Sequence, residues 1–189
     1  MSNFQISKAA ILLAILLAAQ VTSAQTYMQL DRMSWTINSK VNADSYQSKP
    51  TTIGITLGYE IAPNLDVEGM YQSSLDGGDL KINGATQSTP VTNKLSHFYA
   101  ISIKPKISLS DSLTMFGKFS VGSGKATAYA GQYSASSSGS RTALGVGFDF
   151  ELDDKRYLTA SYIKSSKKNY GLATDVYYKG MSIGIGYRF

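Results

Sequence analysis

Cysteine is absent from this chain, and histidine and proline are scarce, with one and four residues respectively. The absence of cysteine excludes disulfide bonds, and it also excludes the lipid-modified cysteine on which a lipoprotein anchor depends. One histidine without any thiol cannot build the His and Cys ligand set of a structural zinc site. We therefore expect neither a disulfide-stabilised fold nor a metal or other cofactor.

The chain also has no apolar run long enough for a membrane-spanning helix, which needs roughly 18 consecutive apolar residues. Its longest run, residues 9–19, follows Lys8 and precedes the small residues Thr22 and Ala24. A basic start, a short apolar stretch and small residues at the cleavage point are typical of a secretory signal peptide. We predict a signal peptide over residues 1–24, cleaved after Ala24, and one domain over residues 25–189. A buried N-terminal helix is the alternative.

A strong excess of one charge sign is lacking as well. The formal net charge is +5, from 18 basic and 13 acidic residues, and loss of Lys8 with the signal peptide leaves +4. The basic residues form no dense run interleaved with aromatics, so nucleic acid is not an expected partner. The modest excess instead suits contact with anionic lipid headgroups or acidic polymers.

What the chain does have is a period of two. In residues 51–61, for example, Ile53, Ile55 and Leu57 alternate with small or polar residues. Alternation of this kind is the signature of a β-strand with one face in an apolar medium. Clear alternation marks residues 51–61, 95–107, 113–124, 141–152 and 177–189, and weaker alternation marks residues 65–72 and 156–164.

The first strand is expected over residues 27–38, but its apolar residues change parity between Leu30 and Met33. A β-bulge near Asp31 and Arg32 would account for the change, because a bulge inserts one extra residue into a strand. With this segment the sequence predicts eight strands, an even number as in single-chain bacterial barrels.

The connections alternate in length along the chain. Short turns are expected at residues 61–64, 108–112 and 153–155, and long loops at residues 39–50, 73–93, 126–140 and 165–174. The Ser/Gly-rich stretch 134–140 suggests that the third loop is flexible. Short turns at one end and long loops at the other are typical of outer-membrane barrels.

Alternation alone does not decide whether the apolar face points outward to lipid or inward to a core, as in a lipocalin-like barrel. Two features favour the outward direction. The other face is small and glycine-rich, as at Gly184 and Gly186, which suits a narrow lumen filled by side chains. Aromatic residues also lie near strand ends, where membrane interfaces favour them. These are Trp35, Tyr59, Tyr71, Tyr157, Tyr162, Tyr177, Tyr187 and Phe189. We predict an all-β fold, an eight-stranded antiparallel up-and-down transmembrane β-barrel.

On strand number, loop asymmetry and its last strand, the chain resembles the small OmpA-like and OmpX-like outer-membrane barrels, which include opacity-type surface proteins. The final residues 183–189 alternate and end on Phe189, and they are similar to the C-terminal assembly signal of this superfamily. The resemblance implies a monomeric barrel in a Gram-negative outer membrane, with long loops outside the cell and both termini in the periplasm. It also implies that the barrel-assembly machinery recognises Tyr187 and Phe189.

Charged residues on the predicted lumen face have both signs and gather near the short turns. They are Glu60, Asp66, Glu68, Lys104, Lys106, Lys118, Asp149, Glu151 and Arg188. Unpaired charges in a narrow lumen would be expensive, whereas neighbouring opposite charges can pair. We predict an interior ion-pair network that plugs the barrel. A narrow, low-conductance ion path is the alternative.

An enzymatic role requires a base beside a nucleophile, because serine is a weak nucleophile on its own. The sole histidine, His97, follows Ser96, and adjacent strand residues point to opposite faces. Tyr99 also occupies the place where the motif of lipid A deacylating barrels would have serine. Asp76 and Asp79 lack the further oxygen ligands of a calcium loop. We therefore predict no catalytic, cofactor-binding or metal-binding residues.

The predicted function is that of a non-enzymatic surface barrel, structural or adhesive, that acts through its loops. Lys164, Lys167, Lys168 and Tyr170 form a basic and aromatic cluster in the fourth loop. Our hypothesis is that this cluster contacts lipopolysaccharide phosphates or an acidic host-surface or extracellular-matrix polymer. Simple solvation of these charges is the alternative for the cluster. A lipid A-modifying barrel enzyme and a narrow channel are the alternatives for the whole chain.

Overall fold

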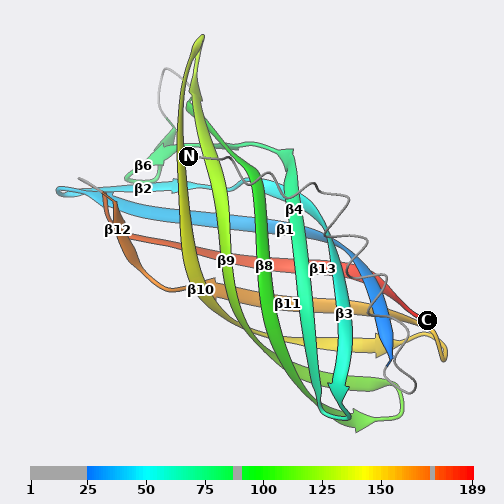
Figure 1. The fold of residues 1–189 in the computed structure, drawn as a ribbon. Helices are drawn as coiled ribbons and strands as arrows, with labels where there is room; N and C mark the ends of the chain where they lie inside the picture. Colours follow the sequence, from blue (N-terminus) through cyan, green and yellow to red (C-terminus); the bar gives the residue numbers. More distant parts are fainter. Residues whose placement is uncertain (1–24, 87–90, 171–172) are drawn as a thin grey trace, which may run out of the picture.

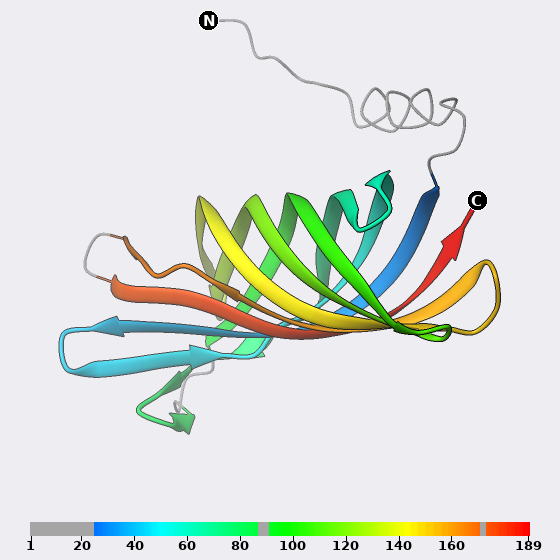
Figure 2. The same ribbon diagram turned by 90° about the horizontal axis from the view of Figure 1, so that it is seen from below.

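The computed structural model describes residues 25–86, 91–170 and 173–189, and the predicted signal peptide with Ala24 lies outside them. The described residues form one antiparallel sheet of thirteen strands and contain no helix long and apolar enough to cross a membrane. Eight long strands make a closed ring, because β1 pairs with β3 along one edge and with β13 along the other. Figures 1 and 2 show the ring from two directions.

The ring strands, in order around the ring, are β1 (Thr26–Val41), β3 (Thr51–Ala62), β4 (Leu65–Asp76), β8 (Val91–Ser110), β9 (Leu113–Ala130), β10 (Tyr133–Glu151), β11 (Arg156–Ser165) and β13 (Ala173–Arg188). The short strands are β2 (Asp44–Ser48), β5 (Gly78–Asp79), β6 (Lys81–Ile82), β7 (Ala85–Thr86) and β12 (Lys168–Tyr170). The short strands pair beyond one end of the ring and extend it.

The apolar face of the ring points outward, as predicted. In β13, Met181 and Ile183 are 68% and 64% exposed, whereas Ser182 between them is 5% exposed. The same alternation recurs in the other ring strands, so the outer wall is apolar and the inner wall is mostly polar. The prediction of an eight-stranded antiparallel barrel with an apolar outside is therefore confirmed.

The two ends of the ring differ. At the short-turn end, β3 joins β4 through residues 63–64, β8 joins β9 through 111–112, and β10 joins β11 through 152–155. Both termini of the ring lie at this end, since the Phe189 backbone N–H donates to the Thr26 carbonyl at 2.9 Å. At the opposite, hairpin end, β1 with β2 and β9 with β10 continue well beyond the ring (Figures 1 and 2).

The bulge expected near Asp31 and Arg32 is absent from β1, so that prediction is wrong. Register with β13 is unbroken from Tyr27 to Asn38, and the irregularity lies between Asn38 and Lys40. Odd-numbered residues therefore face inward throughout, and this set includes Asp31 and Met33. The apparent change of parity arises because large apolar residues enter the interior in the second half of the strand.

Two of the eight aromatic residues expected at membrane interfaces lie inside the ring instead. Trp35 is 7% exposed and Tyr157 is 1% exposed, and both have inward parity. Tyr71, Tyr162, Tyr187 and Phe189 do face outward. Proximity to a strand end therefore identified the wrong face for Trp35 and Tyr157, because only parity decides direction.

The segment 126–140, expected as a flexible loop, is a regular hairpin. Pairing between β9 and β10 continues without a break to Ala130 and Tyr133, around a turn in which Gly131 has φ of 59°. Segment 39–50 is likewise the β1–β2 hairpin, with Asn42 at φ of 54°. Backbone pairing holds these segments in strands although they bury little apolar surface, a condition that a hydrophobicity pattern does not register.

Introduced thiols can check the inward direction of Met33, since the chain has no cysteine of its own. In the folded barrel, Ser34→Cys should react with a membrane-permeant maleimide, whereas Met33→Cys should stay unreactive because Met33 is 4% exposed. Both should react after unfolding in denaturant, which is the control. A reactive Met33→Cys and an unreactive Ser34→Cys in the folded state would support the predicted bulge instead.

Candidate functional site

The interior of the ring is the best-defined polar site of the molecule. Toward the short-turn end it is charged, and toward the hairpin end it is mostly apolar and aromatic, with Arg141 packed on the ring of Tyr178. Each of the nine charged residues expected on the lumen face takes part in at least one ion pair inside the ring. Strand parity turns these side chains inward, and the register of six strands, β3, β4, β8, β9, β10 and β13, brings them together.

Lys104 of β8 is the centre of the charged half. Its ammonium lies 2.8 Å from Asp149 of β10 and 3.6 Å from Glu68 of β4, and it is 2% exposed. Glu68 also pairs with Lys118 of β9 at 2.6 Å. Loss of one partner from a buried pair typically costs about 3–5 kcal/mol, because an uncompensated charge stays behind.

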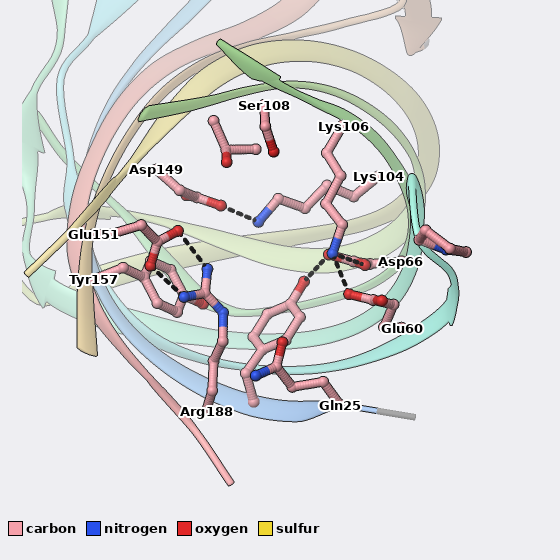
Figure 3. Close-up of a pocket in the computed structure, with 13 residues that line it drawn as sticks. Gln25, Glu60, Asp66, Lys104, Lys106, Ser108, Asp149, Glu151, Tyr157 and Arg188 are labelled. Carbon is pink, nitrogen blue, oxygen red and sulfur yellow. Dashed lines mark hydrogen bonds and ion pairs between the residues drawn. The ribbon is translucent and has the colours of Figure 1, made fainter. Parts of the chain in front are cut away.

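A second layer of ion pairs lies at the mouth of the short-turn end. Lys106 lies 2.6 Å from Glu60 and 2.8 Å from Asp66, and Arg188 binds both oxygens of Glu151, one of them at 2.8 Å. These side chains line a cavity of about 220 Å³ (Figure 3). Cations and anions alternate around this cavity, so each charge has an opposite charge beside it.

Two tyrosines, from the strands β1 and β11 that flank β13, fill the space beside Lys104. Tyr27 donates to Glu68 at 2.7 Å and to Asp66 at 3.2 Å, and its ring meets Tyr157 edge to face with centroids 6.0 Å apart. The Lys104 ammonium lies 5.2 Å from the centroid of the Tyr27 ring, a cation–π distance. The cation is therefore stabilised by carboxylates and by aromatic faces together.

Glycines opposite these tyrosines make room for them. A Cβ atom on Gly58 would overlap the ring of Tyr27, and one on Gly186 would overlap the ring of Tyr157. Small residues on the inner face thus leave space for the large side chains of the neighbouring strand. The glycine-rich face that the sequence displays is a set of recesses for interior side chains.

Asp31 is an interior acid that the sequence analysis missed. It is 4% exposed and accepts hydrogen bonds from Gln29 at 2.7 and 2.8 Å and from Thr56 at 3.2 Å. The bulge predicted near Asp31 and Arg32 made the direction of the Asp31 side chain uncertain, so Asp31 was left out of the predicted lumen residues. Strict alternation of Gln29 and Asp31 with Met28 and Leu30 was the signal that would have placed it inside.

An apolar cluster fills the half of the interior toward the hairpin end, and the sequence analysis missed it too. Its buried members are Met33, Trp35, Leu95 and Ile163. Trp35 Nε1 donates to Thr52 Oγ1 at 3.0 Å, so the one polar atom of this side chain is satisfied. A cavity of about 50 Å³ remains beside the cluster. Side chains thus occupy the lumen at both levels.

Ser96 and His97 do not form a catalytic pair. Ser96 Oγ shares a hydrogen bond of 2.9 Å with Thr127, while His97 stacks on Tyr99 of the outer wall with centroids 6.5 Å apart. Within the described ranges, no group of three or more His, Asp or Glu side chains could hold a metal ion. Asp79 instead accepts a hydrogen bond from Thr92 at 3.1 Å.

The structure describes part of the basic cluster predicted in the fourth loop. Lys164 and Lys167 lie 5.7 and 6.0 Å from the centroid of Tyr177, an aromatic residue that the sequence analysis did not include. Lys168 and Tyr170 belong to β12, and the side chain of Tyr170 lies outside the described part of the chain. Sequence spacing did not reveal Tyr177, because β13 brings it there by cross-strand pairing.

The predicted assembly residues lie at the end of β13 on the outer wall. Tyr187 and Phe189 pack edge to face, with ring centroids 5.3 Å apart. Both side chains are exposed at the short-turn end.

A single methyl group can probe the match between glycine and tyrosine. Gly58→Ala should lower the free energy of unfolding by about 1–3 kcal/mol, because the new methyl overlaps Tyr27, which its hydrogen bonds hold in place. Gly69→Ala is the matched control, since nothing lies within 4 Å of its added Cβ. Denaturant unfolding monitored through the single tryptophan measures both. Equal stability of the two variants would contradict the recess role.

Solved barrels share this architecture. Ail, the attachment invasion locus protein of Yersinia pestis, in complex with the heparin analogue sucrose octasulfate, is 19% identical with a TM-score of 0.58; the match covers 88% of this chain and 99% of Ail. Neisserial surface protein A is 14% identical with a TM-score of 0.66, over 87% of this chain and 97% of that one. The outer membrane protease OmpT from Escherichia coli is 10% identical with a TM-score of 0.50, over 88% and 96%.

These likenesses show the fold alone, and they include surface proteins as well as a protease. No curated protein sequence matches the chain. The model of one family, the outer membrane protein beta-barrel domain, matches residues 9–189, which include all the described strands. The closed ring, its apolar outer wall and this match lead to one conclusion: the chain belongs to the outer membrane protein beta-barrel domain family.

Proposed function

We propose that this protein is a closed, non-enzymatic surface barrel whose hairpin end faces the outside of the cell and contacts ligands there. The observation that carries the proposal is the contrast between the two parts of the molecule. The lumen is occupied by paired charges and apolar side chains, whereas the hairpins continue beyond the ring.

The occupied lumen argues against a channel. Lys104 is nearly inaccessible to solvent, and its ion pairs with Asp149 and Glu68 join three strands across the interior. An ion that crosses this layer would have to separate buried pairs, each stabilised by several kcal/mol relative to an unpaired charge. The nine-residue ion-pair network therefore acts as a plug.

The hairpins argue for a contact surface. Pairing between β10 and β11 ends at Ala143 and Ser165, yet β10 begins at Tyr133. The projecting part of β10 is rich in serine and almost fully exposed, so it adds little to the core. Projecting polar segments on a rigid scaffold are where binding residues are commonly placed.

We also propose how the chain reaches the outer membrane and which end of the barrel faces the periplasm. Residues 1–24 would direct export and be removed after Ala24, and Tyr187 with Phe189 would be read by the barrel-assembly machinery. The monomer would then sit with its short turns and both termini in the periplasm. The bond from Phe189 to Thr26 supports this arrangement, because it places both termini at one end.

The ligand class that fits the hairpin end is an acidic polymer. Lys164 and Lys167 flank Tyr177, and Lys168 lies in the adjacent strand β12. Multiple cations around an aromatic ring suit sulfated or phosphorylated chains. Ail, a barrel of similar fold, was solved with a heparin analogue, which supports testing that class here.

Planar-bilayer recordings of the purified protein test the plug. We expect no large, stable conductance, because the interior charges are paired and the apolar cluster around Trp35 fills the lumen beyond them. A porin run in the same bilayers serves as the positive control. A persistent large conductance would favour the channel hypothesis.

Heparin affinity tests the contact surface. Lys167→Gln with Lys168→Gln should weaken binding about three- to tenfold, since each exposed ion pair contributes up to about 1 kcal/mol. The loss should shrink as salt rises, because salt screens surface charges. Lys81→Gln with Lys94→Gln removes the same charge elsewhere near the hairpin end. An equal loss in this control would assign the binding to net charge rather than to the cluster.

A further inference from the structure

The carboxylates of the ion-pair network outnumber its cations by one. The network contains five carboxylates and four cations, which gives it a formal net charge of −1. Within the described ranges, the other buried charged residues are Asp31 and Arg141, which have opposite signs and leave this balance unchanged. An uncompensated charge inside a narrow lumen is unfavourable, so a fifth cation would stabilise the closed interior.

The excess negative charge lies at the mouth of the short-turn end. Six residues of the network balance one another, three of each sign. They are Lys104, Lys118, Arg188, Glu68, Asp149 and Glu151. In the remaining group, Glu60 and Asp66 share Lys106, whose ammonium lies 2.6 Å from Glu60 and 2.8 Å from Asp66. One cation thus serves two carboxylates at this position.

Glu60 is the less well satisfied of these two carboxylates. Asp66 also accepts a hydrogen bond from Tyr27 at 3.2 Å, whereas Lys106 is the one side chain bound to the Glu60 carboxylate in the part of the chain that the structure describes. Glu60 and Asp66 are direct partners across β3 and β4, where like charges are destabilising. The Glu60 side chain is 27% exposed, so a further cation can reach it from the mouth.

Gln25 lies beside Glu60 on the side away from Asp66. The Glu60 backbone N–H donates to the Gln25 carbonyl at 3.0 Å, and the register of Thr26 with Tyr59 makes Gln25 the next cross-strand partner of Glu60. The Cα atoms of such hydrogen-bonded partners lie about 5.5 Å apart. Gln25 lines the cavity at the mouth (Figure 3). A charge on its backbone nitrogen would therefore lie within reach of the Glu60 carboxylate.

We propose that the α-ammonium of Gln25 is the fifth cation of the network and pairs with Glu60. The inference rests on the proposed cleavage after Ala24. Hydrolysis of that peptide bond leaves a carboxyl group on Ala24 and an amine on Gln25, and α-amines are mostly protonated at neutral pH. Removal of the signal peptide thus completes the neutralisation of the lumen.

The register gives this cation a defined place in the sheet. One row of direct partners crosses β1, β3, β4 and β8, and all of its side chains face the lumen. The row consists of Gln25, Glu60, Asp66 and Lys104. With the α-ammonium at its first position, the row reads cation, anion, anion, cation. Each carboxylate then has a cation on the side away from the other carboxylate.

An N-terminal glutamine allows this single charge to be removed by chemistry. Glutaminyl cyclase catalyses attack of the Gln25 amine on the carbonyl carbon of its own side-chain amide. A C–N bond forms within the residue, ammonia leaves, and the resulting lactam is neutral. The reaction removes one cation and leaves every other residue as it was.

Unfolding of the mature protein tests the pair. Protein purified from outer membranes is unfolded in urea, treated with the cyclase and refolded into phospholipid vesicles, and the single tryptophan reports the transition. Cyclisation should lower the folding equilibrium constant about fivefold, the size of one partly exposed ion pair. In Glu60→Gln the same treatment should change little, because the partner is absent.

Two matched variants serve as controls. Asp153→Asn removes a carboxylate at the same end but outside the lumen, and it should keep the full loss on cyclisation. Gln25→Ala retains the α-ammonium without an amide that can cyclise, and it should be as stable as the untreated wild type. Heat-modifiable gel migration confirms that each variant is folded.

The outcomes separate the pair from the cleavage. No loss in the wild type, an equal loss in Glu60→Gln, or a loss in untreated Gln25→Ala as large as that of the cyclised wild type would overturn the pair alone. The intact mass of the purified protein reports where the chain begins. A chain that begins at another residue would overturn the proposed cleavage and the pair together.

Discussion

Pairing between β1 and β13 is the interaction on which the rest of the molecule depends. It turns an open sheet into a ring, so neither of these long strands keeps an unpaired edge. In a membrane this matters because unpaired backbone groups have no water to bind. Once the ring is closed, strand parity alone decides which side chains meet lipid and which must fit into a narrow interior.

The interior meets that demand by matching size and charge across neighbouring strands. Tyr27 and Tyr157 fit over glycines, and Lys104 lies between carboxylates from different strands. Large apolar side chains around Trp35 fill the half toward the hairpins. The packing that supports the ring and the packing that fills the lumen therefore have the same cause.

The sequence predicted the fold well where alternation was uninterrupted, as in the strand that contains Ile183 and Ile185. It failed at Met33 and Trp35, because apolar residues that enter the lumen imitate a change of phase. It failed again in the serine-rich part of β10, where backbone pairing rather than apolar burial maintains the strand. The contact of Lys164 with Tyr177 depends on cross-strand register, which a one-dimensional pattern does not contain.

The ion pairs of the lumen join residues that are far apart in the chain. Glu68 of β4 needs Lys118 of β9, and Glu151 of β10 needs Arg188 of the last strand. A partly assembled sheet would present these charges to lipid without their partners, at a high free energy. Insertion of one strand at a time is therefore unfavourable. Completion of the ring becomes cooperative, because Arg188 of the last strand neutralises Glu151 of a strand that precedes it in the chain.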